Sequence, residues 1–225
     1  MSIEQNLLDI RQNIENACKK AGRKKEDVCL LAVTKTIDAQ RINEAISLGV
    51  TDIGENRVQE LLAKYDLVDS SVNWHLIGHL QTNKVKYIAD KVCMIHSVES
   101  LPLAIEIDKR CAKIDKVMDI LVEVNVSGEE SKSGINPENA VEFITEISKL
   151  KNIRVKGLMT MAPFEAENVE LHQIFSDLHK ISVDISSKKL DNVSMEHLSM
   201  GMSGDYEVAV QEGSTIVRIG TAVFK

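Results

Sequence analysis

Eight short apolar runs alternate with amphipathic stretches along the 225 residues of this chain, and this alternation constrains the fold more than any other feature. The expected strands cover 28–35, 51–55, 73–79, 92–98, 118–126, 153–161, 192–200 and 215–220. The expected helices between them cover 38–48, 56–68, 84–90, 101–114, 137–150, 168–185 and 204–211. Because strands joined by helical crossovers run parallel, the pattern predicts an α/β fold with a parallel sheet.

The N-terminal segment indicates how this sheet closes. Residues 3–21 carry an apolar helical stripe that ends at Gly22, whereas only 221–225 follow the last expected strand. A helix at the start of the chain can therefore fill the gap between the last strand and the first. The glycine-rich turn typical of an open dinucleotide-binding sheet is not visible. The sequence predicts one domain over residues 1–225, a closed (β/α)8 barrel whose extra N-terminal helix completes the outer ring.

Composition limits the partners of the chain. The net charge is −7, which argues against a dedicated binder of nucleic acid or of anionic membranes. We see no signal peptide and no membrane-spanning stretch, and the four cysteines are scattered without a CxxC pair. We therefore expect reduced cysteines in a cytoplasmic, monomeric protein. No two histidines have the spacing of metal ligands, so we expect no metal site, and we expect His75 and His197 to be core or supporting groups.

The first expected strand ends on a lysine, at the close of the run Leu30–Lys35. Side chains alternate along a strand, so Leu31, Val33 and Lys35 are expected on one face. If that face lines the barrel, Lys35 stands at the mouth of an apolar interior, where burial favours the neutral amine that a Schiff base requires. The alternative is that Lys35 only marks the end of the strand and points into water.

Barrel proteins place their sites at the carboxyl ends of the strands, so the polar residues there are candidates. The residues at these ends are Lys35, Asn56, His79, Ser97, Asn125, Met159, Met161, Ser199, Arg218, Gly220 and Thr221. Lys35 and Arg218 lie on neighbouring strands of a closed barrel, and two inward cations indicate an anionic or polar ligand. The loops 199–204 and 220–221 combine glycine with hydroxyl side chains, which suits a phosphate group. Alternatively, Ser203 serves only as the cap of the helix that follows.

Six short motifs occur in order along most of the chain. They are AVTK at 32–35, GENRVQE at 54–60, WHLIGHLQTNK at 74–84, GLMTM at 157–161, LSMGMS at 198–203 and VRIGT at 217–221. Together they resemble the pyridoxal phosphate homeostasis protein family. The resemblance implies a TIM barrel of the fold-type III class, similar to the N-terminal domain of alanine racemase, that binds pyridoxal 5′-phosphate (PLP).

The resemblance also implies roles for individual residues. Lys35 would hold PLP as an aldimine, and Arg218 would contact the pyridine nitrogen. The phosphate would be held by Ser199 together with Gly220 and Thr221. The ring would be lined by Asn56 and His79. The partners implied are PLP itself and the PLP-dependent apo-enzymes that receive it.

Arg218 bears on whether such a protein is a carrier or an enzyme. Arginine only donates hydrogen bonds, so its partner nitrogen is unprotonated, and an unprotonated ring is a weak electron sink. None of Tyr65, Tyr87 and Tyr206 ends an expected strand. We therefore favour a PLP carrier or regulator without robust catalytic activity. A PLP-dependent amino-acid racemase of low activity and a cofactor-free Schiff-base aldolase using Lys35 remain the alternatives.

Overall fold

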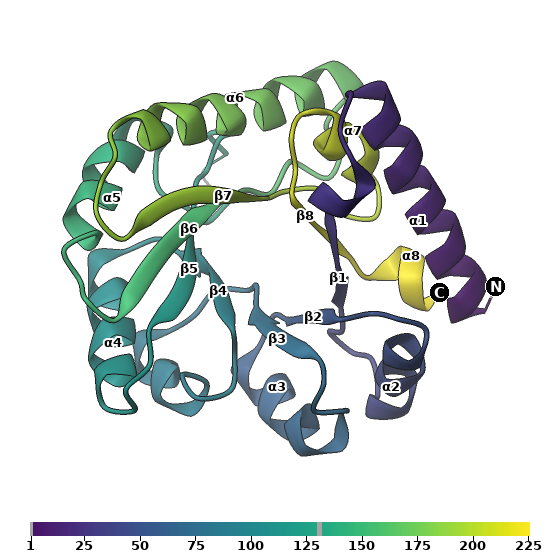
Figure 1. Ribbon diagram of the computed structural model, residues 1–225, viewed down its shortest axis with the longest axis horizontal. Coiled ribbons are helices and arrows are strands. Elements are labelled where there is room, and N and C mark those ends of the chain that lie inside the picture. Colours follow the sequence, from purple (N-terminus) through teal and green to yellow (C-terminus); the bar gives the residue numbers. More distant parts are fainter. Residues whose placement is uncertain (1, 130–131) are drawn as a thin grey trace.

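The computed structural model describes residues 2–129 and 132–225. Its strands are β1 Cys29–Val33, β2 Asp52–Glu55, β3 Asn73–Leu76, β4 Met94–Val98, β5 Met118–Glu123, β6 Ile153–Met159, β7 Val193–Ser199 and β8 Ile216–Ile219. Neighbouring strands pair in parallel, and β1 pairs with β8, so the sheet closes on itself as a barrel. The predicted (β/α)8 fold is confirmed (Figure 1).

The helices form a ring outside the strands (Figure 1). They are α1 Ile3–Lys20, α2 Ala39–Ser47, α3 Val58–Lys64, α4 Leu101–Ala112, α5 Ala140–Ile147, α6 Asn168–Ser187, α7 Tyr206–Gln211 and α8 Thr221–Phe224. Short 3-10 turns occupy η1 Lys25–Asp27, η2 Tyr65–Leu67, η3 Thr82–Tyr87 and η4 Pro137–Asn139. Helix α1 packs against α7 and α8, as predicted for the helix that closes the ring. None of the helices in the described part of the chain is long and apolar enough to cross a membrane.

Two apolar clusters hold the barrel together. The larger lies between the strands and the helices, and it contains the inward stripe of α1. The smaller lies inside the barrel and is formed by Leu31, Val33, Ile77, Met94, Leu121, Met159 and Ile216. Gly54 lets this inner layer close, because a Cβ there would lie 2.5 Å from the Leu31 side chain. The barrel interior is therefore packed with side chains, and its sites lie at the two ends.

Several predicted boundaries differ from the structure. The helix expected over 84–90 is the 3-10 turn η3, and the last residues of the chain form the single-turn helix α8. The first strand was predicted through Lys35 but ends at Val33. The reason is Thr36, whose φ of 63° lies in the left-handed region and turns the chain away from the sheet.

Candidate functional site

A cavity of about 320 Å³ lies at the carboxyl end of the barrel. Val33 and Lys35 come from the end of β1, and Arg218 comes from β8. The loop after β7 contributes residues 202–205, and the loop after β8 contributes Gly220 and Thr221. Because β1 pairs with β8 and β7 pairs with β8, the carboxyl ends of these strands bring a lysine, an arginine and two loops to one place.

Lys35 lines this cavity from a turn and not from a strand. Its side chain is exposed where it lines the cavity together with Val33, and the shared inward face of Leu31, Val33 and Lys35 stays a prediction. The next residue, Thr36, holds the left-handed backbone and donates its N–H to the Glu60 carboxylate at 3.2 Å. A β-branched residue in this region is strained, and such strain is found at ligand sites where the surroundings enforce it.

A buried ion pair holds the backbone before Lys35. Lys64 on α3 lies 2.6 Å from the Glu55 carboxylate, which is fully buried. Lys64 also donates to the carbonyl of Thr34 at 2.9 Å, and the Thr34 hydroxyl donates to Glu55 at 2.9 Å. Removing one partner of a buried pair costs about 3–5 kcal/mol, because the other charge stays buried. These contacts therefore fix the point from which Lys35 leaves the sheet.

Arg218 is a buried cation at the floor of the cavity. It is 4% exposed, and its guanidinium donates to the Ser199 hydroxyl at 2.7 Å and to the Thr160 carbonyl at 2.8 Å. Burial lowers its pKa to about 10, although Glu123 and Asp205 act in the opposite direction, so it stays protonated at neutral pH. A guanidinium has five N–H donors, and no carboxylate among the described residues pairs with it. Its free donors favour an acceptor in the cavity.

The loops beside Arg218 carry further free donors. Ser203 accepts a hydrogen bond from the N–H of Ala222 at 3.2 Å, which joins the loop after β7 to the loop after β8. The role of Ser203 as a helix cap is wrong, because α7 has Asp205 at its N-cap position. The N–H groups of Ser203 and Gly204 have no acceptor within residues 2–129 and 132–225. A Cβ on Gly204 would meet no atom within 4 Å, so this edge of the cavity is open to a ligand.

Sequence comparison places the chain in a family. A family model, the alanine racemase N-terminal domain, matches residues 5–225. A pyridoxal phosphate homeostasis protein from Aquifex aeolicus is 44% identical, over 100% of this chain and 98% of that protein. The chain belongs to the pyridoxal phosphate homeostasis protein family.

Solved structures agree with the family assignment. A protein of unknown function from Bifidobacterium adolescentis shares 38% identity and a TM-score of 0.94, over 99% of this chain and 94% of that one. PipY from Synechococcus elongatus, in its PLP-bound structure, shares 30% identity and a TM-score of 0.87 over 100% of both chains. The barrel of this family member thus superposes on its relatives along its whole length.

Three residues that the family resemblance implies lie outside the cavity lining. Ser199 is fully buried below Arg218, and its hydroxyl also lies 3.0 Å from a ring nitrogen of His96. The His79 side chain is 61% exposed, pairs with Glu99 at 2.8 Å and lines a neighbouring cavity. Asn56 is half-buried, with its backbone against Gly78. The contacts of all three with a ligand stay predictions.

A buried carboxyl group, not predicted from the sequence, also lies at this end of the barrel. Glu123 closes β5 and is 2% exposed. Burial and the nearby Glu99 raise its pKa to about 7, and the charge of Arg218 offsets them only in part. In the expected strand 118–126 this residue lies inside the strand and not at its end, whereas in the structure β5 ends at Glu123. A charged residue inside an apolar run is the signal that could have revealed it.

Proposed function

We propose that this protein binds PLP in the cavity at the carboxyl end of the barrel and acts as a carrier or regulator in PLP homeostasis. One observation supports this most directly. The same cavity is lined by a lysine amine, a buried arginine and two loops. Within residues 2–129 and 132–225, the amine has no partner, the arginine has no carboxylate partner, and the loops have unpaired N–H groups. PLP offers the matching groups, namely an aldehyde, a ring nitrogen and a phosphate.

The residues fit PLP one group at a time. The Lys35 amine would react with the aldehyde, and a free N–H of Arg218 would donate to the ring nitrogen. The phosphate would lie among the Ser203 and Thr221 hydroxyls and the N–H of Gly204, since charge-assisted hydrogen bonds to phosphate oxygens are strong. A volume of about 320 Å³ is within the range of small-molecule sites. The PLP-bound structure of PipY, a similar protein, supports PLP as the ligand.

A carrier fits the cavity better than a racemase. Bound PLP supplies the capacity to stabilise a carbanion, but Arg218 only donates and so favours the unprotonated ring, which is the weaker electron sink. Racemisation also needs an acid or base on each face of the substrate. None of the tyrosines of the chain is among the residues that line the cavity, and the Tyr206 hydroxyl accepts a hydrogen bond from Asn13 at 3.0 Å. Lys35 therefore has no tyrosine opposite it.

We further propose that the protein works as one domain, as a monomer, in the cytoplasm, and that it hands PLP to PLP-dependent apo-enzymes. Four free cysteines suit a reducing compartment. Phe164 is 97% exposed at the rim of the cavity, where an apolar side chain could contact a recipient enzyme.

The test is the visible absorbance of the purified protein mixed with PLP, followed by borohydride reduction and peptide mass spectrometry. We expect a new visible band and a reduced adduct on Lys35. A cofactor-free aldolase would show no visible band as purified, before PLP is added. Chiral analysis of L-alanine incubated with the loaded protein then separates carrier from racemase. Racemisation on the order of 1 per second or faster, an ordinary enzymatic rate, would contradict the carrier.

A further inference from the structure

A chain of hydrogen-bonded side chains runs below the cavity and through the interior of the barrel. Arg218 donates to the Ser199 hydroxyl at 2.7 Å, and that hydroxyl lies 3.0 Å from Nδ1 of His96. Nε2 of His96 lies 2.9 Å from Nδ1 of His75, and Nε2 of His75 lies 3.0 Å from Oδ1 of Asp52. The chain thus joins the cavity at one end of the barrel to a carboxylate at the other end.

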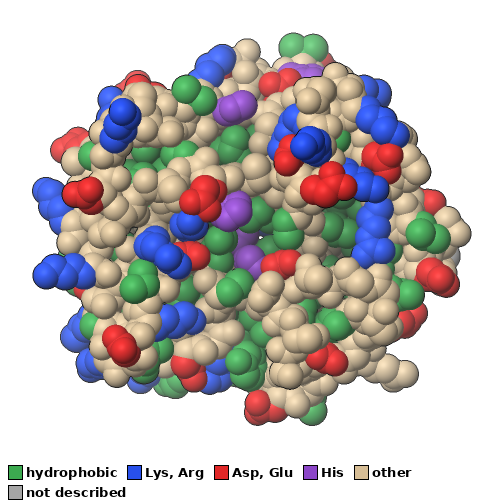
Figure 2. Space-filling model, viewed as in Figure 1, with side chains coloured by type: hydrophobic (Ala, Val, Ile, Leu, Met, Phe, Trp, Pro, Cys, Tyr) green, Lys and Arg blue, Asp and Glu red, His purple; other side chains and the backbone are tan. Residues whose placement is uncertain are grey.

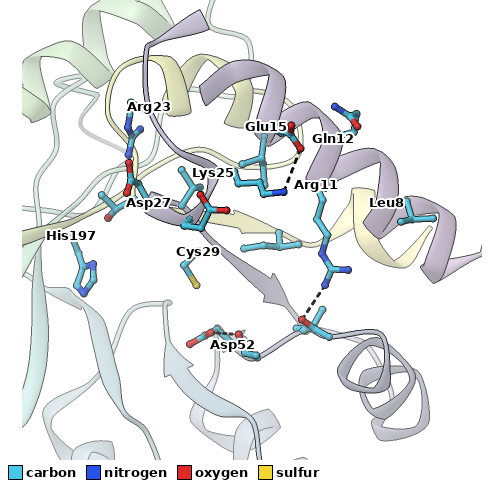
Figure 3. A pocket seen from close by; sticks show the side chains of 18 of the residues that line it. Leu8, Arg11, Gln12, Glu15, Arg23, Lys25, Asp27, Cys29, Asp52 and His197 are labelled. Carbon is cyan, nitrogen blue, oxygen red and sulfur yellow. Dashed lines mark hydrogen bonds and ion pairs between the residues drawn. The ribbon is translucent and has the colours of Figure 1, made fainter. Parts of the chain in front are cut away.

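The interior links of this chain are shielded from water. His96 and Ser199 are fully buried, and His75 is 5% exposed. Asp52 lies in the wall of a larger cavity at the amino end of the barrel, close to Cys29 (Figure 3). Buried polar groups that lack a partner are costly, so each ring nitrogen and hydroxyl in the chain must be either donor or acceptor in a consistent order.

The two ends of the chain fix that order. Arg218 can only donate and an ionised Asp52 can only accept. The Ser199 oxygen accepts from Arg218, which leaves the hydroxyl hydrogen to donate to Nδ1 of His96. His96 must then carry its proton on Nε2 and donate to Nδ1 of His75. His75 in turn carries its proton on Nε2 and donates to Asp52.

The electrostatics agree with this order. Burial, with the positive charge of Arg218 adding to it, lowers the pKa of His96 well below its usual value, so this ring is neutral. Burial alone would raise the pKa of Asp52. Hydrogen bonds from His75, Thr51 and Asn73 outweigh it and lower that pKa to about 2. The thiol of Cys93, 3.3 Å from His75, donates to the Trp74 carbonyl and so leaves the His75 proton to Asp52.

We propose that Ser199, His96 and His75 are positioning residues, which use the fixed donor order set by Asp52 to hold the Arg218 guanidinium with its free N–H groups toward the cavity. Only the predicted effect of these residues on PLP affinity rests on the proposed function. It gives Ser199 a role different from the phosphate contact that the family resemblance implies. The hydroxyl already accepts from Arg218 and has its hydrogen available to His96, so it orients the cation that would meet the ring.

The first test measures the proton positions in the protein without PLP. Two-bond proton–nitrogen correlation spectra separate the two neutral forms of histidine, and H75N and H96N variants identify the signals. We expect His75 and His96 both to carry the proton on Nε2. We expect D52N to raise the Nδ1-protonated fraction of His75, and the control D119N, at the same end of the barrel, to leave both rings unchanged. A proton on Nδ1 of either ring in the unaltered protein would overturn the proposal.

The second test compares two ligands. Without the Ser199 hydroxyl, Arg218 loses one partner and its orientation, so S199A should weaken PLP and pyridoxal by the same factor, about tenfold or more. S199T, which keeps the hydroxyl, should restore most of the affinity. T221V should weaken PLP more than pyridoxal, since only PLP carries the phosphate. A loss in S199A confined to PLP would overturn the positioning role, and so would unchanged affinity for both ligands. If the unaltered protein binds no PLP, the proposed function is wrong. The proton positions of His75 and His96 then still test the donor order of the hydrogen-bonded chain.

Discussion

The cavities at the two ends of the barrel differ in volume and in the number of polar groups that lack a protein partner, and the two differences point in opposite directions. The cavity at the amino end is about 1030 Å³, and the cavity at the carboxyl end is about 320 Å³. In the larger cavity the cations have protein partners. Arg11 donates to the carbonyl of Gly49 at 3.0 Å, Arg23 donates to that of Val210 at 2.7 Å, and Lys25 lies 3.6 Å from Glu15 (Figure 3).

The smaller cavity holds the unsatisfied groups. Arg218 has no carboxylate partner among the described residues, and Lys35 beside it is exposed in its turn. On the face drawn in Figure 2, by contrast, acidic side chains lie beside basic ones around a hollow centre with histidines. The comparison teaches that free donors, more than space, indicate where a ligand belongs.

Replacing Lys35 with alanine should abolish the visible absorbance of bound PLP. Among the described residues, Lys35 is the one amine in the lining of the smaller cavity. Its exposed position means that the fold should persist. Absorbance after PLP addition and circular dichroism measure the two outcomes. Lys25→Ala, in the larger cavity, is the matched control and should keep the full band. A full borohydride-reducible adduct in Lys35→Ala would place PLP on another lysine.

The carboxyl groups at the two ends should respond to pH in opposite ways. The raised pKa of Glu123, about 7 against 4.5, means that the folded state holds this proton more tightly than the unfolded state. Its stabilising effect is therefore lost as pH rises from 4.5 to 7, by about 3 kcal/mol in the free energy of unfolding. Asp52, with a pKa of about 2, loses its stabilising effect only as pH falls below 3.8.

Urea unfolding between pH 4.5 and 7.5 measures this effect. Glu123→Gln should remove most of the loss of stability with rising pH. The control Glu138→Gln, at an exposed position, should lose as much stability as the unaltered protein. If the free energy of unfolding of Glu123→Gln falls with pH as steeply as that of the unaltered protein, the buried carboxyl group does not hold its proton in the folded state.

Thr221→Val tests whether the smaller cavity binds the phosphate. Loss of a hydrogen bond to a charged group costs about 1.5–3 kcal/mol, so PLP should bind correspondingly more weakly, and pyridoxal should be nearly unaffected. Titration of both ligands measures the difference. Thr145→Val, on α5 and away from the residues that line the cavity, is the matched control, and it should change neither affinity. Equal losses of PLP and pyridoxal in Thr221→Val would place the phosphate elsewhere.

Thr36→Gly tests the strained turn beside Lys35. Glycine adopts a positive φ without strain, so the free energy of unfolding should rise by up to about 1 kcal/mol. PLP should bind a few-fold more weakly, because the lysine before the glycine is held less firmly. Asp115 lies before β5 with a φ of 52°. Asp115→Gly should raise the free energy of unfolding by less, since aspartate tolerates the left-handed region better than threonine does. A drop in stability for Thr36→Gly would show that the turn is unstrained.

The sequence by itself determined the barrel and the candidates at its carboxyl end. Short apolar runs alternating with helical stripes predict parallel strands. The helix expected over 38–48 is α2, where the Asp38 carboxylate accepts from the Arg41 N–H at 2.9 Å. Parallel closure also predicts that Lys35 and Arg218 lie on neighbouring strands. These features follow from local periodicity and from the geometry of crossovers.

The tertiary structure alone decided how those candidates are used. Glu60 and the left-handed Thr36 set Lys35 in a turn, and Glu99 pairs with His79 at a separate cavity. The pair of His96 and Ser199 joins residues 103 positions apart. No sequence period encodes such contacts. The partner of a polar side chain depends on which groups the closed barrel brings within hydrogen-bond distance, and burial then sets the cost of leaving any of them unpaired.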